Sequence, residues 1–171
     1  MARCTILRRR RINDLLIICN NSAHRNRVFS RQEELTAMNI TNFTFKELVE
    51  TDTGLDNMPN DMNVVKNLVR LAQFLQTVRN ELHLPIVVTS GYRSKEVNEA
   101  VGGVLSSYHV KGLAADIKCA DMDKLLAVLH SHLMDIDQLG IYYSKTTQLW
   151  FHVGLAEDDK VPRNQIYTRE I

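Results

Sequence analysis

Apolar residues recur at helical spacing through the middle of the chain. Between residues 64 and 82 they fall three and four positions apart, which is the pattern of a helix with one buried face. Asn60 or Asp61 can cap the start of this helix. A shorter helix is expected before it, because Thr44 and Glu47 have the spacing of a capping box. The sequence therefore predicts two consecutive helices, of which the second is long and contributes to the core.

Four short segments are rich in β-branched, aromatic and small apolar residues, which is typical of strands. Two further helices lie between them, one capped by Ser94 and one by Asp121. Because helices and strands do not alternate as regular βαβ units, the pattern favours an α+β fold in which helices flank a small antiparallel or mixed sheet. The four expected strands are residues 85–89, 113–117, 139–143 and 149–153.

Length and composition agree with one folded domain. The chain has 171 residues, of which 44% are hydrophobic and 24% are charged. This balance can form a buried core and is unlike that of a disordered chain or a membrane protein. No apolar stretch approaches the length of a transmembrane helix. The three cysteines are an odd number without a C-x-x-C pair, so a disulfide framework is not expected.

Charge is unevenly distributed along the chain. The first 34 residues contain eight arginines and three acidic residues, a net charge of about +5 against +1 for the whole chain. Such an arm can attract nucleic acid, but the chain has no recognisable nucleic-acid module, so a solvated extension is the preferred interpretation. The apolar run at 15–19 is too short for a signal peptide. We therefore expect a basic, partly disordered extension at 1–38, a domain at 39–158 and a C-terminal tail at 159–171.

Three residues in the second half of the chain have the side chains of a metal site. His109 lies in a turn-like stretch, Asp116 follows a short apolar run, and His152 lies in an aromatic, strand-like run. Any one of them alone is also compatible with a structural role, and the other four histidines are interpreted in that way. Two imidazoles and one carboxylate together suit a catalytic zinc ion, because three protein ligands leave the fourth tetrahedral position for a water or a substrate oxygen.

Four motifs include or surround these residues. They are Thr89–Ser94, Asn98–Gly103, the S-x-H-x-x-G-x-A-x-D pattern of Ser107–Asp116, and Trp150–Val153. In this order and spacing they resemble the zinc D-alanyl-D-alanine carboxypeptidase and peptidoglycan endopeptidase family, and within it the small carboxypeptidase-like branch that phages also encode. The resemblance covers residues 42–155. It implies a Hedgehog/DD-peptidase-like fold and one Zn²⁺ ion with His109, Asp116 and His152 as its ligands.

The resemblance also assigns roles to two residues beside the metal ligands, Arg93 and Ser107. Arg93 corresponds to the arginine that reaches the scissile carbonyl or a substrate carboxylate in such enzymes. A guanidinium is always charged and presents a planar fork of donors, so it can stabilise an oxyanion in the transition state. The alternative is a surface salt bridge of little energetic weight. Ser107 and Tyr92 are expected to bind substrate, although Ser107 can equally stabilise a turn.

The general base is the point at which the sequence departs from the family pattern. Relatives carry an acidic residue or a histidine close to the last metal ligand. The corresponding residues here are Gln148, Leu149, Trp150 and Phe151. Asp137 is therefore named as the candidate catalytic acid–base residue, and Tyr142 as a hydrogen-bond donor. Because zinc alone can lower the pKa of a water to about 7, the missing acid bears on the rate of hydrolysis more than on metal binding.

The resemblance implies a zinc metallopeptidase that hydrolyses a peptide bond in bacterial peptidoglycan, as a D-Ala-D-Ala carboxypeptidase or as an endopeptidase of cross-links or stem peptides, in cell-wall lysis or remodelling. The alternative is a zinc-bound, catalytically weak or inactive peptidoglycan-binding or virion protein of the same fold. The expected partners are peptidoglycan stem peptides and not nucleic acid, and a monomer is expected. Without a signal peptide, a phage-encoded protein would remain in the host cytoplasm until it reaches the wall, or would be part of the virion.

Overall fold

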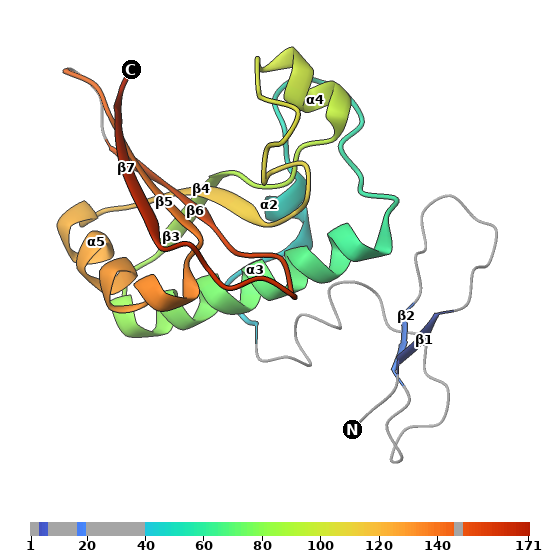
Figure 1. Cartoon of the computed structure of the whole chain (residues 1–171), viewed down its shortest axis with the longest axis horizontal. Coiled ribbons are helices and arrows are strands. Elements are labelled where there is room, and N and C mark those ends of the chain that lie inside the picture. The colour runs from blue at the N-terminus through green and yellow to red at the C-terminus, as the bar shows by residue number, and fades with distance from the viewer. Residues whose placement is uncertain (1–3, 7–16, 20–39, 146–148) are drawn as a thin grey trace.

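The computed structural model of the protein is shown in Figure 1. It describes residues 4–6, 17–19, 40–145 and 149–171. Near the N-terminus, β1 (Cys4–Ile6) and β2 (Ile17–Cys19) pair as two short antiparallel strands. The rest of the basic extension predicted at 1–38, including its run of four arginines, lies outside the described residues.

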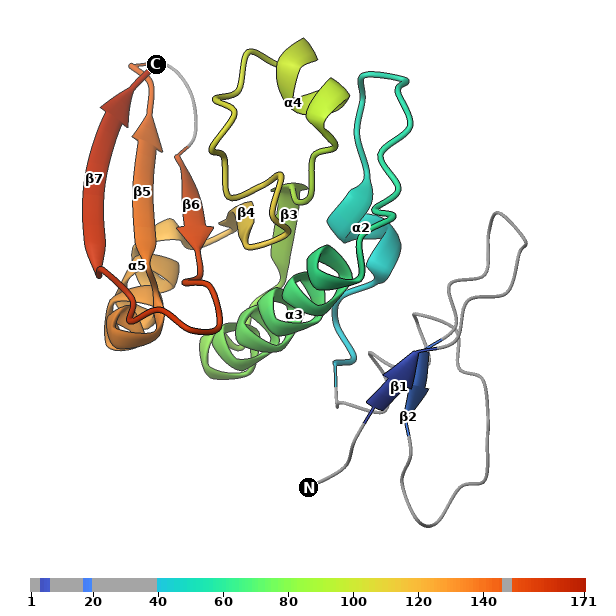
Figure 2. The ribbon, with the colours of Figure 1, turned by 45° about the vertical axis from the view of Figure 1, so that its right-hand side comes forward.

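A five-stranded sheet forms the centre of the domain (Figure 2). Its strands are β3 (Ile86–Ser90), β4 (Ala114–Cys119), β5 (Gln138–Tyr143), β6 (Trp150–Gly154) and β7 (Gln165–Glu170). The order across the sheet is β3–β4–β6–β5–β7, and all neighbours are antiparallel except β5 and β7, which run parallel. The predicted α+β fold with a small mixed sheet is therefore confirmed.

The helices begin at caps that the sequence indicates. They are α2 (Phe45–Val49), α3 (Met62–Leu82), α4 (Lys95–Ala100) and α5 (Met122–Ser131), and α5 is followed by a 3-10 turn, η1 (Leu133–Asp135). Thr44 and Glu47 form a complete capping box at α2, and Asp61, rather than Asn60, caps α3. Ser94 and Asp121 cap the other two helices. None of the helices in the described ranges is both long and apolar enough to span a membrane.

The core lies between one face of the sheet and the helices α3 and α5. Along β4 and β6 the side chains alternate, so that Ile117 and Phe151 belong to the core cluster while Asp116 and His152 lie on the opposite face. Helix α3 contributes fully buried leucines between residues 68 and 82 to the same cluster. One face of the sheet is thus filled by packing, and the other carries the polar residues.

The C-terminal boundary of the domain differs from the prediction. Residues 159–171 were expected to form a tail, but they contain β7, which pairs with β5 along its whole length, from Gln138 with Gln165 to Tyr143 with Glu170. β7 is an edge strand and is largely exposed, so its sequence lacks the apolar alternation that marks a half-buried strand. The folded domain therefore continues to the end of β7.

Candidate metal centre

The pairing of β4 with β6 places two of the predicted metal ligands side by side. Asp116 and His152 are register partners in this antiparallel pair, and both lie on the face of the sheet away from the core. Partners in an antiparallel pair have Cβ atoms about 4.5–5.5 Å apart on the same face. The carboxylate and the imidazole therefore meet without any unusual backbone geometry.

The third predicted ligand, His109, reaches the same point from the loop before β4. Its Nδ1 atom donates a hydrogen bond to the carbonyl oxygen of Gly91 over 2.6 Å, and its own carbonyl oxygen accepts from the backbone N–H of Arg93. With the proton on Nδ1, the lone pair of Nε2 is directed toward the other ligands. Gly91 is required here, because a Cβ atom at this position would collide with the backbone carbonyl of Leu48.

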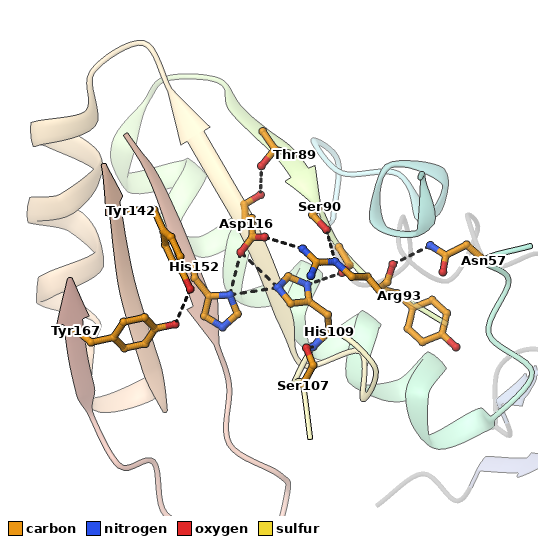
Figure 3. Close-up of polar contacts among 12 residues, drawn as sticks. Asn57, Thr89, Ser90, Arg93, Ser107, His109, Asp116, Tyr142, His152 and Tyr167 are labelled. Carbon is orange, nitrogen blue, oxygen red and sulfur yellow. Dashed lines mark hydrogen bonds and ion pairs between the residues drawn. The ribbon is translucent and has the colours of Figure 1, made fainter. Parts of the chain in front are cut away.

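The three ligand atoms form a compact triangle (Figure 3). His109 Nε2 lies 3.2 Å from His152 Nδ1 and 3.4 Å from Asp116 Oδ1, and His152 Nδ1 lies 2.9 Å from Asp116 Oδ1. A tetrahedral zinc ion with bonds of about 2.0–2.1 Å has ligand atoms about 3.3–3.4 Å apart. Two of the three separations agree with this value to about 0.2 Å, so the donor atoms and their spacing fit one zinc ion.

The environment of Asp116 keeps its carboxylate ionised. Burial by itself would raise the pKa of Asp116, but the hydrogen bonds and electrostatic interactions with the His109 and His152 rings outweigh burial and hold the pKa far below its ordinary value. Arg93 Nη2 binds the second oxygen, Oδ2, at 3.0 Å. Because Arg93 holds Oδ2, Oδ1 is left to face the two imidazoles, which is the arrangement of a ligand oriented by an outer partner.

The loop after β3 holds Arg93 by several contacts. Its Nε atom donates to Ser90 Oγ at 2.9 Å. On either side of it, the buried Asn57 side chain donates to the carbonyl oxygen of Tyr92 and accepts from the N–H of Ser94. The guanidinium is therefore held against the metal ligands by both its side chain and its backbone. The positioning role of Asn57 was not anticipated from the sequence, which contains no local signal for it.

A cavity of about 740 Å³ opens in front of the three candidate metal ligands. Its walls come from the loop between α4 and β4, from β5 and β6, and from β7. Among the described residues that line it, Asp116 is the only carboxylate. The lining also contains four cationic side chains, Arg93, Lys111, Arg163 and Arg169. Three of these cations are already paired with carboxylates, Arg93 with Asp116, Lys111 with Glu157 and Arg163 with Asp137, so the excess of positive charge at the cavity is small.

Two of the predicted residues beside the metal ligands line this cavity. Arg93 lies against Asp116, as described above. Ser107 also lines the cavity, and its Oγ accepts a hydrogen bond from the N–H of His109 at 3.3 Å. The hydrogen bond to His109 is typical of a turn-stabilising serine, whereas the position in the cavity lining is typical of a substrate-binding one. The position of Ser107 is therefore compatible with both roles.

Tyr92 is not placed where the sequence suggested. It is largely buried and does not line the cavity beside the metal ligands. Instead it lines a separate, smaller hollow, next to Glu47 and Asp52. Arg93 lines both hollows, whereas Tyr92 lines only the smaller one.

Asp137 does not lie where an acid–base residue for the candidate metal centre was predicted. Its side chain is 3% exposed and is held by Arg163, whose Nη2 lies 2.6 Å from Oδ2 and whose backbone N–H donates to Oδ1 at 2.9 Å. Asp137 does not line the cavity, whereas its neighbour Gln138 does. Its observed contacts are those of an anchor between the start of β5 and the segment before β7.

Residues of β7 complete the cavity, and the sequence interpretation did not include them. Gln165, Tyr167 and Arg169 all line it, as expected for alternate residues of one strand. Tyr142, predicted as a hydrogen-bond donor, lies beside them with its hydroxyl 3.4 Å from that of Tyr167. The spacing of two between the three β7 residues was the available signal, but it becomes informative only once β7 is known to be a strand.

Comparison with known proteins agrees with this geometry. Residues 37–153, more than half of the chain, match the family model described as Peptidase M15. A search of curated proteins gave no match. The matched segment contains His109, Asp116 and His152 and ends before β7. The chain therefore belongs to the M15 family of zinc-dependent, D-Ala-D-Ala carboxypeptidase-like peptidases.

Proposed function

We propose that the protein is a zinc metallopeptidase that hydrolyses a peptide bond in bacterial peptidoglycan, as a D-Ala-D-Ala carboxypeptidase or as an endopeptidase of cross-links or stem peptides. The observation that carries this proposal is the triangle of donor atoms from His109, Asp116 and His152 at the base of a cavity, with the Arg93 guanidinium beside it. The family membership supports a peptidase, and the three residues would hold its zinc ion.

Zinc would supply Lewis-acid polarisation of the scissile carbonyl and a water with a pKa near 7. The protein supplies the orientation of the ligands. The hydrogen bond from His109 Nδ1 to Gly91 sets the tautomer, and Arg93 sets the orientation of the Asp116 carboxylate. These contacts are already in place, so the ligands need little rearrangement to bind the ion.

Arg93 has a second role toward the substrate. Its guanidinium uses Nε for Ser90 and Nη2 for Asp116, and it lines the cavity. A guanidinium has five N–H donors, so others remain for a substrate oxygen. A fixed donor of this kind binds an oxygen more strongly as negative charge develops on it, which lowers the barrier to attack on the peptide carbonyl.

The lining of the cavity favours a short anionic peptide as substrate. Arg169 adds positive charge away from the candidate metal ligands. Lys111 and Arg163 are paired with Glu157 and Asp137 and add N–H donors, and Val101 and Val104 add an apolar edge. Peptidoglycan stem peptides combine free carboxylates with the methyl side chains of alanine. Positive groups would bind the former, and the valine edge would contact the latter.

One observation favours a second candidate function. Asp116 is the only carboxylate among the described residues that line the cavity, and Asp137 is bound to Arg163 outside it. A protein without a second acidic group beside its metal ligands has no side-chain carboxylate to accept the proton of the attacking water. The second candidate is therefore a zinc-bound protein of the same fold that binds peptidoglycan and cleaves it weakly or not at all.

Mass analysis of peptidoglycan fragments distinguishes the two functions. Purified walls of several peptidoglycan types would be incubated with the zinc-loaded protein, with the chelated protein and with the His152→Ala variant. The peptidase predicts new fragments with the zinc-loaded wild type alone. Loss of one terminal alanine would indicate a carboxypeptidase, and conversion of cross-linked fragments to monomers would indicate an endopeptidase. An unchanged fragment pattern with zinc bound would contradict the peptidase and favour the binding protein.

A further inference from the structure

A single row of paired residues crosses four strands of the sheet at the level of the metal ligands. Asp116 on β4 pairs with His152 on β6, His152 pairs with Gly140 on β5, and Gly140 pairs with Tyr167 on β7. Residues in register on neighbouring strands lie on the same face of a sheet. Tyr167 therefore belongs to the same row and the same face as two metal ligands, although it lies beyond the segment that matches the family model.

Gly140 leaves room for the Tyr167 side chain within this row. A Cβ atom at Gly140 would lie 2.7 Å from both Cζ and the hydroxyl oxygen of Tyr167. The tyrosine ring thus lies across the glycine, and its hydroxyl end is directed from β7 toward His152. Figure 3 shows the two tyrosine hydroxyls between the Tyr167 ring and His152.

Neighbouring aromatic rings hold this hydroxyl in place. The Tyr167 ring packs edge-on against Tyr142, with ring centres 6.1 Å apart, and Tyr142 stacks on Trp150 at 5.1 Å with an angle of 8° between the planes. The hydroxyls of Tyr167 and Tyr142 lie 3.4 Å apart. All three rings line the cavity. The row of metal ligands is therefore continued by a rigid aromatic wall that ends in two hydroxyl groups.

The hydroxyls of Tyr142 and Tyr167 together leave one O–H donor available for a ligand. Each phenol carries one O–H, and the contact between the two tyrosines uses one of the two protons. Burial, followed by the contact with Tyr142, raises the pKa of Tyr167 above its ordinary value, so its hydroxyl stays protonated at neutral pH. One donor thus remains directed into a cavity that contains the metal ligands.

We propose that Tyr167 is a catalytic residue that donates a hydrogen bond to the carbonyl oxygen of the bound substrate peptide, and that Tyr142 positions it. This inference rests on the proposed peptidase function and adds a substrate contact from β7. The bond strengthens as the carbonyl oxygen becomes an oxyanion, opposite the contribution of Arg93 from the loop after β3. No proton is transferred in this role, because the hydroxyl acts only as a donor.

Replacement of Tyr167 by Phe tests the proposal, because it removes the hydroxyl but keeps the ring over Gly140. The zinc-loaded variant should keep one zinc ion per chain and lose about a hundredfold in kcat on purified peptidoglycan, with a small change in KM. Tyr143→Phe is the matched control, since Tyr143 lies on β5 outside the lining of the cavity and should behave as the wild type. A Tyr167→Phe variant with the wild-type kcat would overturn the proposal.

Calorimetric binding of the pentapeptide L-Ala-γ-D-Glu-L-Lys-D-Ala-D-Ala separates this proposal from the proposed function. If the wild type binds the peptide but cleaves nothing, the proposed peptidase function is wrong, but the proposed hydrogen bond from Tyr167 to the substrate can still be tested. Affinity of Tyr167→Phe several-fold weaker than that of Tyr143→Phe would then support the contact, and equal affinities would contradict it. A wild type that neither cleaves peptidoglycan nor binds the pentapeptide would overturn both proposals.

Discussion

Asp116 Oδ1 lies 2.9 Å from His152 Nδ1, and the two residues are register partners in the antiparallel pair of β4 and β6. The position of both ligands thus follows from the pairing of the strands. A slip of one residue would turn either side chain toward the core, since alternate residues face opposite sides of a sheet. The packing of the opposite face therefore also holds the metal ligands together.

Replacing His152 with Ala should abolish zinc retention and peptidoglycan cleavage together. The variant removes one of three ligands and leaves a donor set too small for a stable site. Zinc content by mass spectrometry and cleavage by fragment analysis would be measured on the same sample. The matched control is His130→Ala on the exposed surface of α5, which should retain both properties. Normal cleavage by His152→Ala would show that the ligand assignment is wrong.

Replacing Arg93 with Lys should affect both metal binding and catalysis. Lys presents one ammonium nitrogen in place of the two fixed guanidinium nitrogens that bind Ser90 and Asp116, so the carboxylate loses its rigid outer partner and zinc affinity should fall by about 10- to 100-fold. At saturating zinc, kcat should still be lower by about 10- to 100-fold, because the planar donor beside the substrate is lost. Full activity at saturating zinc would mean that Arg93 only orients Asp116. Arg79→Lys on α3 provides the control.

Replacing Asp137 with Asn should reduce stability and leave catalysis largely intact. The buried carboxylate loses its ion pair with Arg163, which should cost about 1–3 kcal/mol of the free energy of unfolding at pH 7. Zinc content and kcat should stay within a few-fold of the wild type, because Asp137 does not line the cavity. The surface variant Asp159→Asn controls for the loss of one charge. A large fall in kcat with zinc retained would restore Asp137 as the acid–base residue.

The same variant has a defined pH dependence. Burial alone would raise the pKa of Asp137, but the hydrogen bonds and charge of Arg163 lower it in the folded protein. Because the pKa of Asp137 is lower in the folded than in the unfolded protein, the ionised carboxylate stabilises the fold at any pH above its unfolded pKa of about 3.9. This stabilisation is lost as the pH falls through the pKa of the folded protein. The difference in melting temperature between wild type and Asp137→Asn should therefore be constant at neutral pH and shrink below about pH 4. A difference that grows on acidification would contradict this assignment.

Replacing Gly140 with Ala should be destabilising because of Tyr167. The new Cβ atom would lie 2.7 Å from the tyrosine ring, and relief of such overpacking costs about 1–3 kcal/mol. In a Tyr167→Ala background the same substitution should cost little, since the colliding ring is absent. Urea unfolding of the two single variants and the double variant would measure this coupling. Equal costs in both backgrounds would show that the ring does not lie over Gly140.

Features that depend on local sequence were predicted successfully. The helix caps at Thr44 and Asp121 depend on hydrogen bonds that reach only three residues along the chain. Motifs with informative spacing indicate Asp116 and His152 as candidate metal ligands, and alternation along each strand places both on one face of the sheet. The arginine beside them could likewise be named from its motif.

Features that depend on distant pairings were not predictable. The side-chain contacts of Asp137 are made by Arg163, which lies 26 residues later in a segment that lacks apolar alternation. The place of Tyr167 depends on a parallel pairing of β5 with β7, for which the exposed β7 sequence carries no local signal. Tyr92 shows a different difficulty, because a motif identifies a segment but not which of two neighbouring side chains faces the metal ligands.

The most direct test of the central claim is anomalous diffraction at the zinc edge from crystals of the full chain grown with one equivalent of zinc. The account predicts one strong peak within bonding distance of His109 Nε2, Asp116 Oδ1 and His152 Nδ1, with Arg93 still on Asp116 Oδ2. A peak bonded to other residues, or no peak between these three atoms, would contradict the assignment of the metal centre and the peptidase mechanism built on it.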